Sequence, residues 1–489
     1  MGHGLRRRSD HYYNLWSGIM LAGLGLRLRI FLLFAGVAAA SCTVVAAALY
    51  FGYSRIAEAG AGSGFVLAGL LSVFGLLAIS AAIWMLFDEN VAKPVQQLSA
   101  AIRTRAHADV DAPIDLEGAK YLGDLAPAAY AVTGRLMDNT ADASEMVADA
   151  TAQLAAERAQ LALLLSEIPV AIVLVSPVHK IMLYDGQAAD ILGQVHVPRL
   201  GASIFDYFVE EELRTAYGQL TGSRTEIAVD VKGARVSLSF QVRLKKLSQS
   251  PGYMILIDET TARLAPEARR PLIYDFDAIR HNSEKAIEQR PLQELSFVVF
   301  DTETTGLMPN KDEIVQIGAV RVVNGRIIPG ETVDQLVNPG RPIPPGSTKV
   351  HRITDDMVAE APDPATAISG FHIFARDSVI VAHNAPFDMA FLHKYGSISG
   401  QVWDHPILDT VLLSAVVFGA EQEHTLDALC ARLDIEIPQN LRHTALGDAQ
   451  ATAEALCKLL PILTSRGLDT FGKVTNQTRK YGRLLKDMN

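Results

Sequence analysis

The sequence of 489 residues predicts an α/β domain in its C-terminal third, preceded by two membrane-spanning helices and a smaller α+β domain. Two long uncharged apolar runs near the N-terminus predict the helices. Short β-branched runs separated by turns predict the α+β domain. Apolar strands that end in carboxylates and alternate with helical segments predict the α/β domain. A chain of this length is expected to contain two or three domains.

The composition limits the kinds of partner that the chain can bind. The formal net charge is -10, whereas phosphate binding depends on lysine and arginine. Contact with nucleic acid therefore has to be local, mediated by metal ions, or both. The three cysteines, Cys42, Cys430 and Cys457, lie far apart and indicate neither a disulfide framework nor a zinc site.

Residues 1–29 form a basic N-terminal segment, and apolar runs follow from Ile30 to Tyr53 and from Phe65 to Phe87. Each run is long enough to cross a hydrocarbon core of roughly 30 Å as a helix. Arginines before the first run predict a cytoplasmic N-terminus, and two crossings return the rest of the chain to the cytoplasm. We therefore expect residues 30–87 to anchor the chain in a membrane. The alternative, a signal peptide cleaved before Cys42, is disfavoured because the apolar run continues past that residue.

Residues 88–165 are expected to be mostly helical. Pro94 can start a helix, and Val95, Leu98 and Ile102 follow at helical spacing. A helix, a connector and a second helix directly after a membrane span resemble a HAMP signal-relay module, with a plain juxtamembrane helix as the alternative. The stretch 141–165 contains neither glycine nor proline, which predicts a continuous helix. That helix either forms a coiled coil in a homodimer or packs on its own domain.

Residues 166–260 carry the pattern of a small mixed domain. Strands are predicted at Val170 to Val175, Lys180 to Tyr184, Glu226 to Val231, Ala234 to Val242 and Gly252 to Asp258. Two strands, short helices and three further strands resemble a PAS sensor domain. No residue requires a ligand, and His179 is expected in an exposed turn. Residues 261–295 are charged, contain three prolines and predict a linker.

The chemistry begins at a short apolar strand that ends in two carboxylates. Phe297 to Phe300 is followed by Asp301 and Glu303. Because residues two apart on a strand point to the same face, these carboxylates are expected side by side. Adjacent carboxylates repel each other unless a cation compensates them, and oxygen-only ligands suit Mg²⁺ or Mn²⁺.

Two later segments place further polar groups at strand and helix ends. The apolar strand Val379 to Ala382 leads through His383 into a helix that carries Asp388 in its first turn. His443 precedes a helix that carries Asp448 in its first turn, so these two side chains are expected to lie close together. Lone residues of these types are common on surfaces, but the combination at three junctions predicts a site.

In order and spacing, these three segments resemble the DEDDh exonucleases, similar to the proofreading (epsilon) subunit of bacterial DNA polymerase III. The Tyr branch of that superfamily has a tyrosine at the position of Thr444, whereas this sequence has His443 one residue earlier, which indicates the His branch. The resemblance covers Ser296 to about Leu463. It implies a ribonuclease H-like α/β domain over residues 296–465, with a mixed five-stranded sheet flanked by helices. Residues 466–489 then form a basic C-terminal tail.

The resemblance also implies catalytic roles for Asp301, Glu303, Asp388, Asp448 and His443. Asp301 would bridge two divalent cations, Mg²⁺ or Mn²⁺, that lie roughly 4 Å apart. Glu303 and Asp448 would complete the first ion's site, and Asp388 would hold the second. His443 would accept the proton of the attacking water. The reaction expected is release of nucleoside 5′-monophosphates from nucleic-acid 3′ ends.

The resemblance suggests substrate contacts at Thr304, Leu307, His351, Asn384 and Phe387, each with a structural role as the alternative. Acidic residues outnumber basic ones nearly two to one between Ser296 and Leu463, which favours binding of only a few terminal nucleotides. Single-stranded DNA is a more natural substrate than RNA on this view.

The prediction as a whole is a multi-pass protein of the bacterial inner membrane with a cytoplasmic 3′–5′ exonuclease domain. One alternative is a polymerase III epsilon-like proofreading subunit, which two membrane spans disfavour. The other is a membrane signalling protein whose nuclease domain only binds nucleotides.

Overall fold

A computed structural model represents the chain, and it divides into two compact units. It describes residues 26–54, 62–108, 110, 119–123, 125–133, 170–221, 224–247, 252–258, 273–274 and 286–489. The first unit comprises Met1–Ile102 with Pro113–Arg135, and the second comprises Arg103–Ala112 with Leu136–Asn489.

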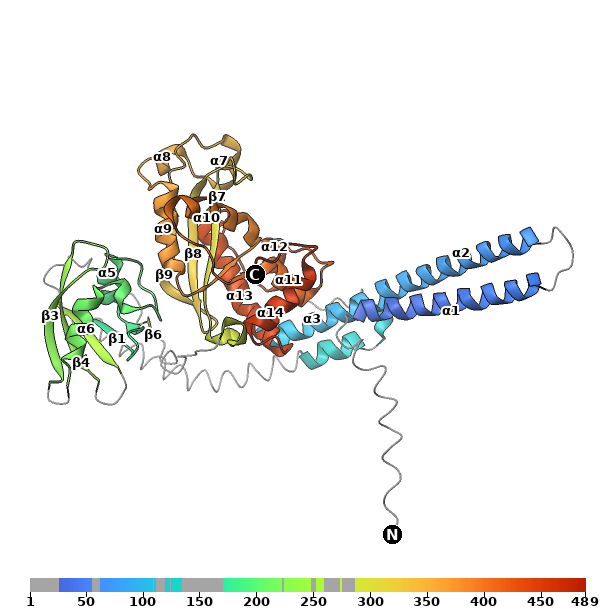
Figure 1. Ribbon diagram of the computed structural model, residues 1–489, viewed down its shortest axis with the longest axis horizontal. Helices are drawn as coiled ribbons and strands as arrows, with labels where there is room; N and C mark the ends of the chain where they lie inside the picture. The colour runs from blue at the N-terminus through green and yellow to red at the C-terminus, as the bar shows by residue number, and fades with distance from the viewer. Residues whose placement is uncertain are drawn as a thin grey trace, which may run out of the picture. The chain divides into compact units, whose positions relative to one another are not determined.

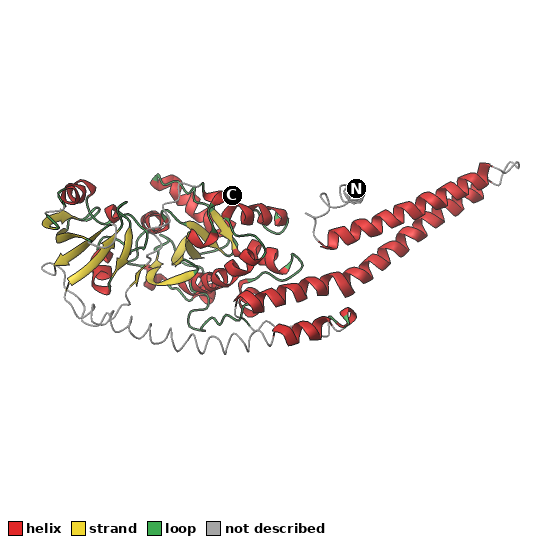
Figure 2. Cartoon of the chain, turned by 90° about the horizontal axis from the view of Figure 1, so that it is seen from below, coloured by secondary structure: helices red, strands yellow, loops and turns green. Residues whose placement is uncertain are grey.

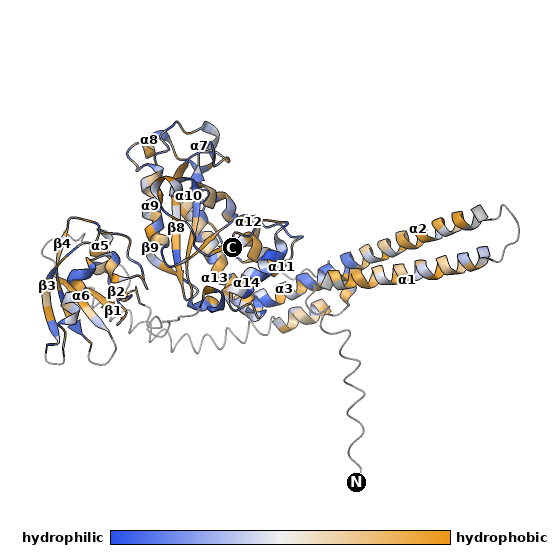
Figure 3. Ribbon diagram, in the orientation of Figure 1, coloured by the Kyte–Doolittle hydropathy of each residue, from blue (hydrophilic) through white to orange (hydrophobic). Residues whose placement is uncertain are grey.

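The first unit contains a hairpin of two long helices, α1 (Leu26–Ser54) and α2 (Gly62–Phe87). The rings of Phe31 and Trp84 meet edge to face with centroids 5.2 Å apart, which joins the start of α1 to the end of α2. The helices are therefore antiparallel (Figure 1). Both are long and apolar enough to cross a membrane by length and composition, and Figure 3 shows apolar residues along most of their length.

Beyond the hairpin the chain remains helical. A π-helical turn (Asp88–Ala92) leads into α3 (Lys93–Ala108), and a 3₁₀ turn (Lys120–Leu122) precedes a helix at residues 125–133. Leu98 of α3 packs with Ala119 and Ala126 in a small buried cluster. The predicted helix 141–165, and the homodimer through it, lie outside the described residues. The HAMP-like connector stays a prediction.

The second unit opens with an antiparallel sheet in the order β3-β4-β5-β1-β2-β6 (Figure 1). Its strands are β1 (Val170–Val175), β2 (Ile181–Tyr184), β3 (Glu226–Lys232), β4 (Ser239–Lys246), β5 (Tyr253–Asp258) and β6 (Ile273–Tyr274). Helices α5 (Gly186–Gly193) and α6 (Glu210–Gly218) and a 3₁₀ turn (Ile204–Asp206) contribute to its core. We refer to this part as the β1–β6 domain.

Two expectations for the β1–β6 domain were wrong. Strand β4 runs from Ser239 to Lys246 rather than from Ala234 to Val242, because residues before Ser239 form the turn that pairs β3 with β4. His179 is buried rather than exposed, and its Nδ1 lies 2.8 Å from the Tyr253 hydroxyl. Its backbone is left-handed, with φ of 63°, which turns the ring inward among aromatic side chains.

The C-terminal domain is built on a mixed five-stranded sheet in the order β11-β10-β7-β8-β9, as predicted. Figure 2 shows the strands in yellow and the helices around them in red. The strands of this sheet are β7 (Ser296–Thr304), β8 (Ile314–Val323), β9 (Arg326–Leu336), β10 (Val379–Ala382) and β11 (Ile407–Asp409). Strands β7, β10 and β11 are parallel, whereas β8 is antiparallel to β7 and β9.

Helices cover both faces of this sheet. They are α7 (Pro345–His351), α8 (Asp355–Val358), α9 (Pro364–Ala375), α10 (Ala385–Ser399), α11 (Thr410–Phe418), α12 (Leu426–Arg432), α13 (Ala445–Ser465) and α14 (Phe471–Thr478). Successive side chains of β7 point to opposite faces of the sheet, so the residues they contact show which helices cover each face. Phe297 and Val299 share a core with α11 to α14, whereas Val298 and Phe300 share one with α9 and α10.

The C-terminal domain extends beyond both predicted boundaries. Leu292 and Leu295, placed in the predicted linker 261–295, are buried in its core, and the Leu292 amide donates to the Asp469 carbonyl. The predicted tail 466–489 contains α14, whose Phe471 is also buried. The Asn489 side chain pairs with the backbone of Ile407 on the edge strand β11. The segments at both ends of the domain therefore belong to its fold, because their apolar side chains are buried in its core.

Candidate active site

Three carboxylates meet at the end of strand β7. Ligand oxygens of Asp301, Glu303 and Asp448 all lie within 4.8 Å of one another. Asp301 and Glu303 follow Phe297 and Val299 on the odd-numbered face of β7, the face that α13 covers. Asp448 lies in the first turn of α13 and reaches the same point from above this face.

The N-terminus of α13 reaches Asp301 because strand β8 has no side chain at the contact. Gly318 pairs with Asp301 across the ladder, and a Cβ at Gly318 would lie 2.0 Å from the Ala445 carbonyl carbon. Gln316 on the same strand accepts a hydrogen bond from the Ala445 amide at 3.1 Å. Thr444 caps the helix, since its hydroxyl accepts from the Gly447 amide at 3.1 Å.

Asp388, the fourth predicted carboxylate, lies outside this cluster. It is in the first turn of α10, which covers the even-numbered face of β7, and its side chain is buried. Its Oδ1 accepts hydrogen bonds from the Thr302 hydroxyl at 2.6 Å and the Thr302 amide at 3.1 Å. The structure thus brings three of the four acids together and holds the fourth against Thr302, near enough for its charge to raise the pKa of Asp301.

The electrostatics of the site oppose ionisation of all four acids. Burial and then the charge of Asp448 raise the pKa of Glu303 to about 8. Burial also raises the pKa of Asp388 to about 7, although the Thr302 hydrogen bonds oppose the shift. Burial, Asp388, Glu303 and Asp448 all raise the pKa of Asp301. Ionisation of these clustered carboxylates is unfavourable unless a cation compensates their charge. Because all the ligands are oxygens, divalent cations such as Mg²⁺ or Mn²⁺ fit the site.

His443 stands at the open side of the cluster. It is exposed and directly precedes the cap of α13, with a left-handed backbone at φ of 58°. Burial raises the pKa of Asp448, and the charge of His443 and a hydrogen bond from the His443 backbone partly oppose this shift. Left-handed backbone is uncommon for residues other than glycine and recurs at functional sites. The side chain is therefore near the carboxylates and accessible from solvent.

The predicted substrate contacts fall into two groups, and the first surrounds the end of β7. Thr304 is largely buried, and its hydroxyl donates to the Gly306 carbonyl at 2.8 Å. Leu307 is 83% exposed beside the site, so it is free to touch a ligand. His351 is buried, its Nδ1 accepts from the Ile353 amide at 3.0 Å, and burial lowers its pKa. The buried Nε2 of His351 has no hydrogen-bond partner among the described residues, so its predicted substrate contact stays a prediction.

The second group begins α10. Asn384 caps the helix with a left-handed backbone at φ of 73°, and its side chain is exposed. Phe387 is partly buried and packs edge to face on Phe391, with ring centroids 5.4 Å apart. Beneath them, the buried carboxylate of Asp409 accepts from the amides of Ala385 at 2.6 Å and Val411 at 2.8 Å.

Four residues that shape the site were not identified from the sequence: Thr302, Gly318, Asp409 and Gly447. Thr302 lies between the two strand carboxylates, so its even-numbered position could have indicated a contact on the other face. A Cβ at Gly447 would lie 2.0 Å from the Leu441 carbonyl oxygen. Both glycines act through close backbone approaches, which no local sequence pattern reveals.

The exonuclease family (RNase_T) matches residues 298–456. A DNA polymerase III subunit epsilon-like protein of Rhodobacter capsulatus is 33% identical, and the match covers 96% of this chain and 100% of that protein. The PolC-type DNA polymerase III of Bacillus subtilis is 36% identical over 40% of this chain, but this is only 14% of its own length. A structure of exonuclease X in complex with 5′ overhanging duplex DNA is 29% identical, with a TM-score of 0.31, and covers 37% of this chain and 99% of that one.

The similarity to the Rhodobacter capsulatus protein extends over nearly the whole of both chains. The exonuclease match coincides with the domain that holds the carboxylate cluster. The chain therefore belongs to the DNA polymerase III subunit epsilon-like family, and its C-terminal domain is a DEDD-type exonuclease.

Proposed function

We propose that the chain is a membrane-anchored 3′–5′ exonuclease that uses two divalent cations and releases nucleoside 5′-monophosphates. The observation that carries this proposal is the cluster of Asp301, Glu303 and Asp448, with ligand oxygens within 4.8 Å of one another. Exonucleases of this family generally use divalent metal ions, and the buried oxygen-only ligand set fits Mg²⁺ or Mn²⁺.

The chain's own residues have distinct tasks in this proposal. Asp301, Glu303 and Asp448 would hold one cation, and Asp301 with Asp388 a second. When bound, such cations lower the pKa of a water molecule and stabilise charge on the reacting phosphate. His443, exposed beside Asp448, would take the proton from the attacking water, because imidazole can accept a proton near neutral pH.

The surroundings of the cluster favour a short single-stranded 3′ end. Leu307 is 83% exposed next to the carboxylates, so it can lie against a terminal base without first moving out of a core. Asn384, at the start of α10, is also exposed. Single-stranded DNA is our proposed substrate, since base stacking on apolar side chains tolerates any sequence. Thr304 and Phe387 would support these contacts from partly buried positions.

The N-terminal half would locate the nuclease and not perform chemistry. Helices α1 and α2 are long and apolar enough to anchor the chain in the bacterial inner membrane, with the exonuclease domain in the cytoplasm. The strand order β3-β4-β5-β1-β2 supports a PAS-like assignment for the β1–β6 domain. A proofreading role is the second candidate, favoured by the relatives that are named DNA polymerase III subunits.

Substitution of one metal-binding oxygen tests the chemistry. Asp301→Asn should abolish Mg²⁺-dependent degradation of single-stranded DNA while the chain stays folded, because a neutral amide cannot bridge two cations. Loss of carboxylate repulsion should also raise the melting temperature in EDTA. Asp230→Asn, at an exposed position on strand β3 of the β1–β6 domain, is the matched control. Degradation by Asp301→Asn at the parent rate would reject the proposal.

Reporter fusions test the anchor. Reporters that distinguish cytoplasm from periplasm, placed at Ser63 and after Asn489, should give a periplasmic loop and a cytoplasmic C-terminus. A cytoplasmic loop or an external C-terminus would show that the proposed topology is wrong.

A further inference from the structure

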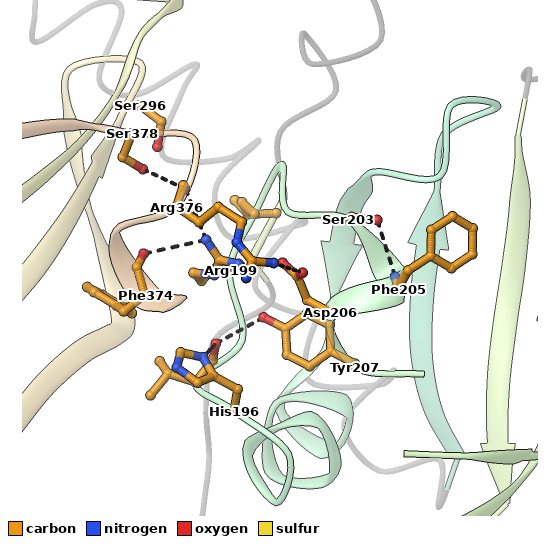
Figure 4. Close-up of polar contacts among 12 residues, drawn as sticks. His196, Arg199, Ser203, Phe205, Asp206, Tyr207, Ser296, Phe374, Arg376 and Ser378 are labelled. Carbon is orange, nitrogen blue, oxygen red and sulfur yellow. Dashed lines mark hydrogen bonds and ion pairs between the residues drawn. The ribbon is translucent and has the colours of Figure 1, made fainter. Parts of the chain in front are cut away.

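The β1–β6 domain contacts the exonuclease domain through buried charged groups. The Arg199 side chain is 2% exposed and pairs with Asp206 at 2.5 Å within its own domain. The same guanidinium donates to the Arg376 carbonyl at 3.1 Å, just beyond the end of α9 (Figure 4). Asp206 also pairs with the Arg376 side chain at 2.6 Å. One carboxylate thus joins an arginine from each domain.

A second set of contacts centres on Glu331 of strand β9, whose side chain is fully buried. It accepts hydrogen bonds from the Tyr184 hydroxyl at 2.7 Å and from the Leu200 amide at 2.6 Å, both in the β1–β6 domain. It also pairs with Arg321 of β8 at 2.8 Å. A buried charge is costly to leave unpaired, and Glu331 has partners from both domains.

Two adjoining cavities lie along this junction, with volumes of about 120 Å³ and about 660 Å³. They share Lys180, Arg290, Ser296, Arg376 and Asp377 in their linings and therefore form one cleft. The larger cavity is within the usual size range of small-molecule sites, about 300–1,000 Å³. Beyond the shared residues, the lining of the larger cavity includes Ile287, His372, Val402 and His405, together with the carboxylate of Asp404.

The smaller cavity is unusually rich in cations. Five of its thirteen lining residues are lysine or arginine, against 44 of 489 in an acidic chain. The five are Lys180, Arg199, Arg290, Arg321 and Arg376, and two carboxylates, Glu294 and Asp377, share the lining. Such a concentration of guanidinium and ammonium donors recognises phosphate groups.

Charge pairing does not fully neutralise these cations. Asp206 forms ion pairs with two arginines, Arg199 and Arg376, whereas Glu331 forms an ion pair with Arg321. Within the part of the chain that the structure describes, neither Lys180 nor Arg290 has a carboxylate at ion-pair distance. Three lining arginines, Arg199, Arg290 and Arg321, also have a buried Nε without a hydrogen-bond partner among the described residues, as has Nδ1 of His405. Donors are therefore in excess over acceptors around the cleft.

The cleft is separate from the catalytic cluster. Its lining includes Ser296 at the start of β7, Ser378 and Val379 at the start of β10, and Pro406 just before β11. The catalytic carboxylates lie at the opposite, carboxyl end of β7. Asp301 lies five positions after Ser296 along the strand, which corresponds to roughly 17 Å. A ligand in the cleft would therefore leave the catalytic cluster free.

We propose that this cleft is a second binding site, for a small phosphate monoester of mononucleotide size. The phosphate lies at the cationic end, against Lys180, Arg290 and Arg376. The apolar or aromatic part lies at the end lined by His372 and Val402. Because both domains contribute cations, the ligand stabilises their docked arrangement by mass action.

Binding of deoxyadenosine 5′-monophosphate to the full chain in detergent tests this proposal. Excess EDTA removes metal from the catalytic cluster, whose carboxylates then repel phosphate, so the test does not depend on nuclease activity. We expect saturable binding by calorimetry, competition by inorganic phosphate and no binding of deoxyadenosine. The proposal would be overturned if deoxyadenosine bound as tightly as deoxyadenosine 5′-monophosphate. It would also be overturned if the monophosphate did not bind at millimolar concentration.

Three substitutions assign the binding to the cleft. Lys180→Ala removes an exposed cation and should weaken binding on the order of tenfold. Asp377→Asn removes an acid at a left-handed residue that asparagine tolerates, and should strengthen binding severalfold. Lys246→Ala on strand β4 is the matched control, since that lysine is exposed outside the cleft. Unchanged affinity in both Lys180→Ala and Asp377→Asn would contradict the assignment.

Discussion

Gly318→Ala is the substitution that probes the assembly of the active site most sharply. The added Cβ would lie 2.0 Å from the Ala445 carbonyl carbon and 2.1 Å from the Leu446 amide nitrogen. Both obstacles are backbone, so no side-chain rotation can relieve the overlap. Optimal carbon contacts lie at about 3.5 Å, so the start of α13 has to move by about 1.5 Å. His443 and Asp448 move with it.

The expected effect on activity is larger than the effect on stability. Misplacement of catalytic groups by about 1 Å can cost about 100-fold in rate, so turnover should fall by at least that factor. Overpacking of this kind destabilises by about 1–3 kcal/mol, which leaves a folded chain. Turnover on a single-stranded oligonucleotide and thermal unfolding measure the two effects.

Gly370→Ala is the control for this substitution. It lies in helix α9, where an added Cβ meets nothing within 4 Å, so activity should be unchanged and stability equal or slightly higher. Retention of activity within threefold by Gly318→Ala would refute the argument that β8 positions α13.

Three further predictions follow from the same geometry. His443→Ala should lower turnover by about two to four orders of magnitude near neutral pH and less at high pH, whereas exposed His393→Ala should not, as pH–rate profiles will show. In EDTA, the raised pKa values of Glu303 (about 8) and Asp388 (about 7) mean that protonation stabilises the fold at low pH and that this contribution is lost as pH rises towards 8. The increase in melting temperature on adding Mg²⁺ should therefore grow between pH 5.5 and 8.5, and a constant increase would contradict this. Asp409→Asn should destabilise the chain by about 1–3 kcal/mol and weaken Mn²⁺ binding, because an amide places a donor against the Ala385 or Val411 amide; calorimetry checks both.

Local patterns in the sequence predicted individual strands and helices, and the resemblance to the DEDDh exonucleases implied the fold that contains them. The alternation around Asp301 and Glu303 placed both on one face of a strand, and β7 indeed runs from Ser296 through Thr304. Strand β8 and the turn at Asn324 and Gly325 also follow the predicted pattern. These features depend on neighbouring residues, which is why periodicity reveals them.

Contacts between distant residues could not be predicted in this way. Gly318 and Ala445 are far apart in sequence, and only the packed structure shows why the glycine is required. Asp388 was expected to contribute to the carboxylate site, but its hydrogen bonds to Thr302 could not be predicted. The ion pair of Arg376 and the hydrogen bonds of Glu331 with the β1–β6 domain were also missed, because an isolated charged residue normally indicates a solvated surface.

The polarity of degradation tests the central proposal most directly. A single-stranded DNA carrying a 5′ label should shorten stepwise in Mg²⁺, with the label retained on the shortened strands and nucleoside 5′-monophosphates released. The same strand with a phosphorothioate at its 3′-terminal linkage should be degraded far more slowly, while one at the 5′-terminal linkage should make no difference. Immediate release of the 5′ label as a mononucleotide, or internal cleavage of a circular strand, would contradict the account.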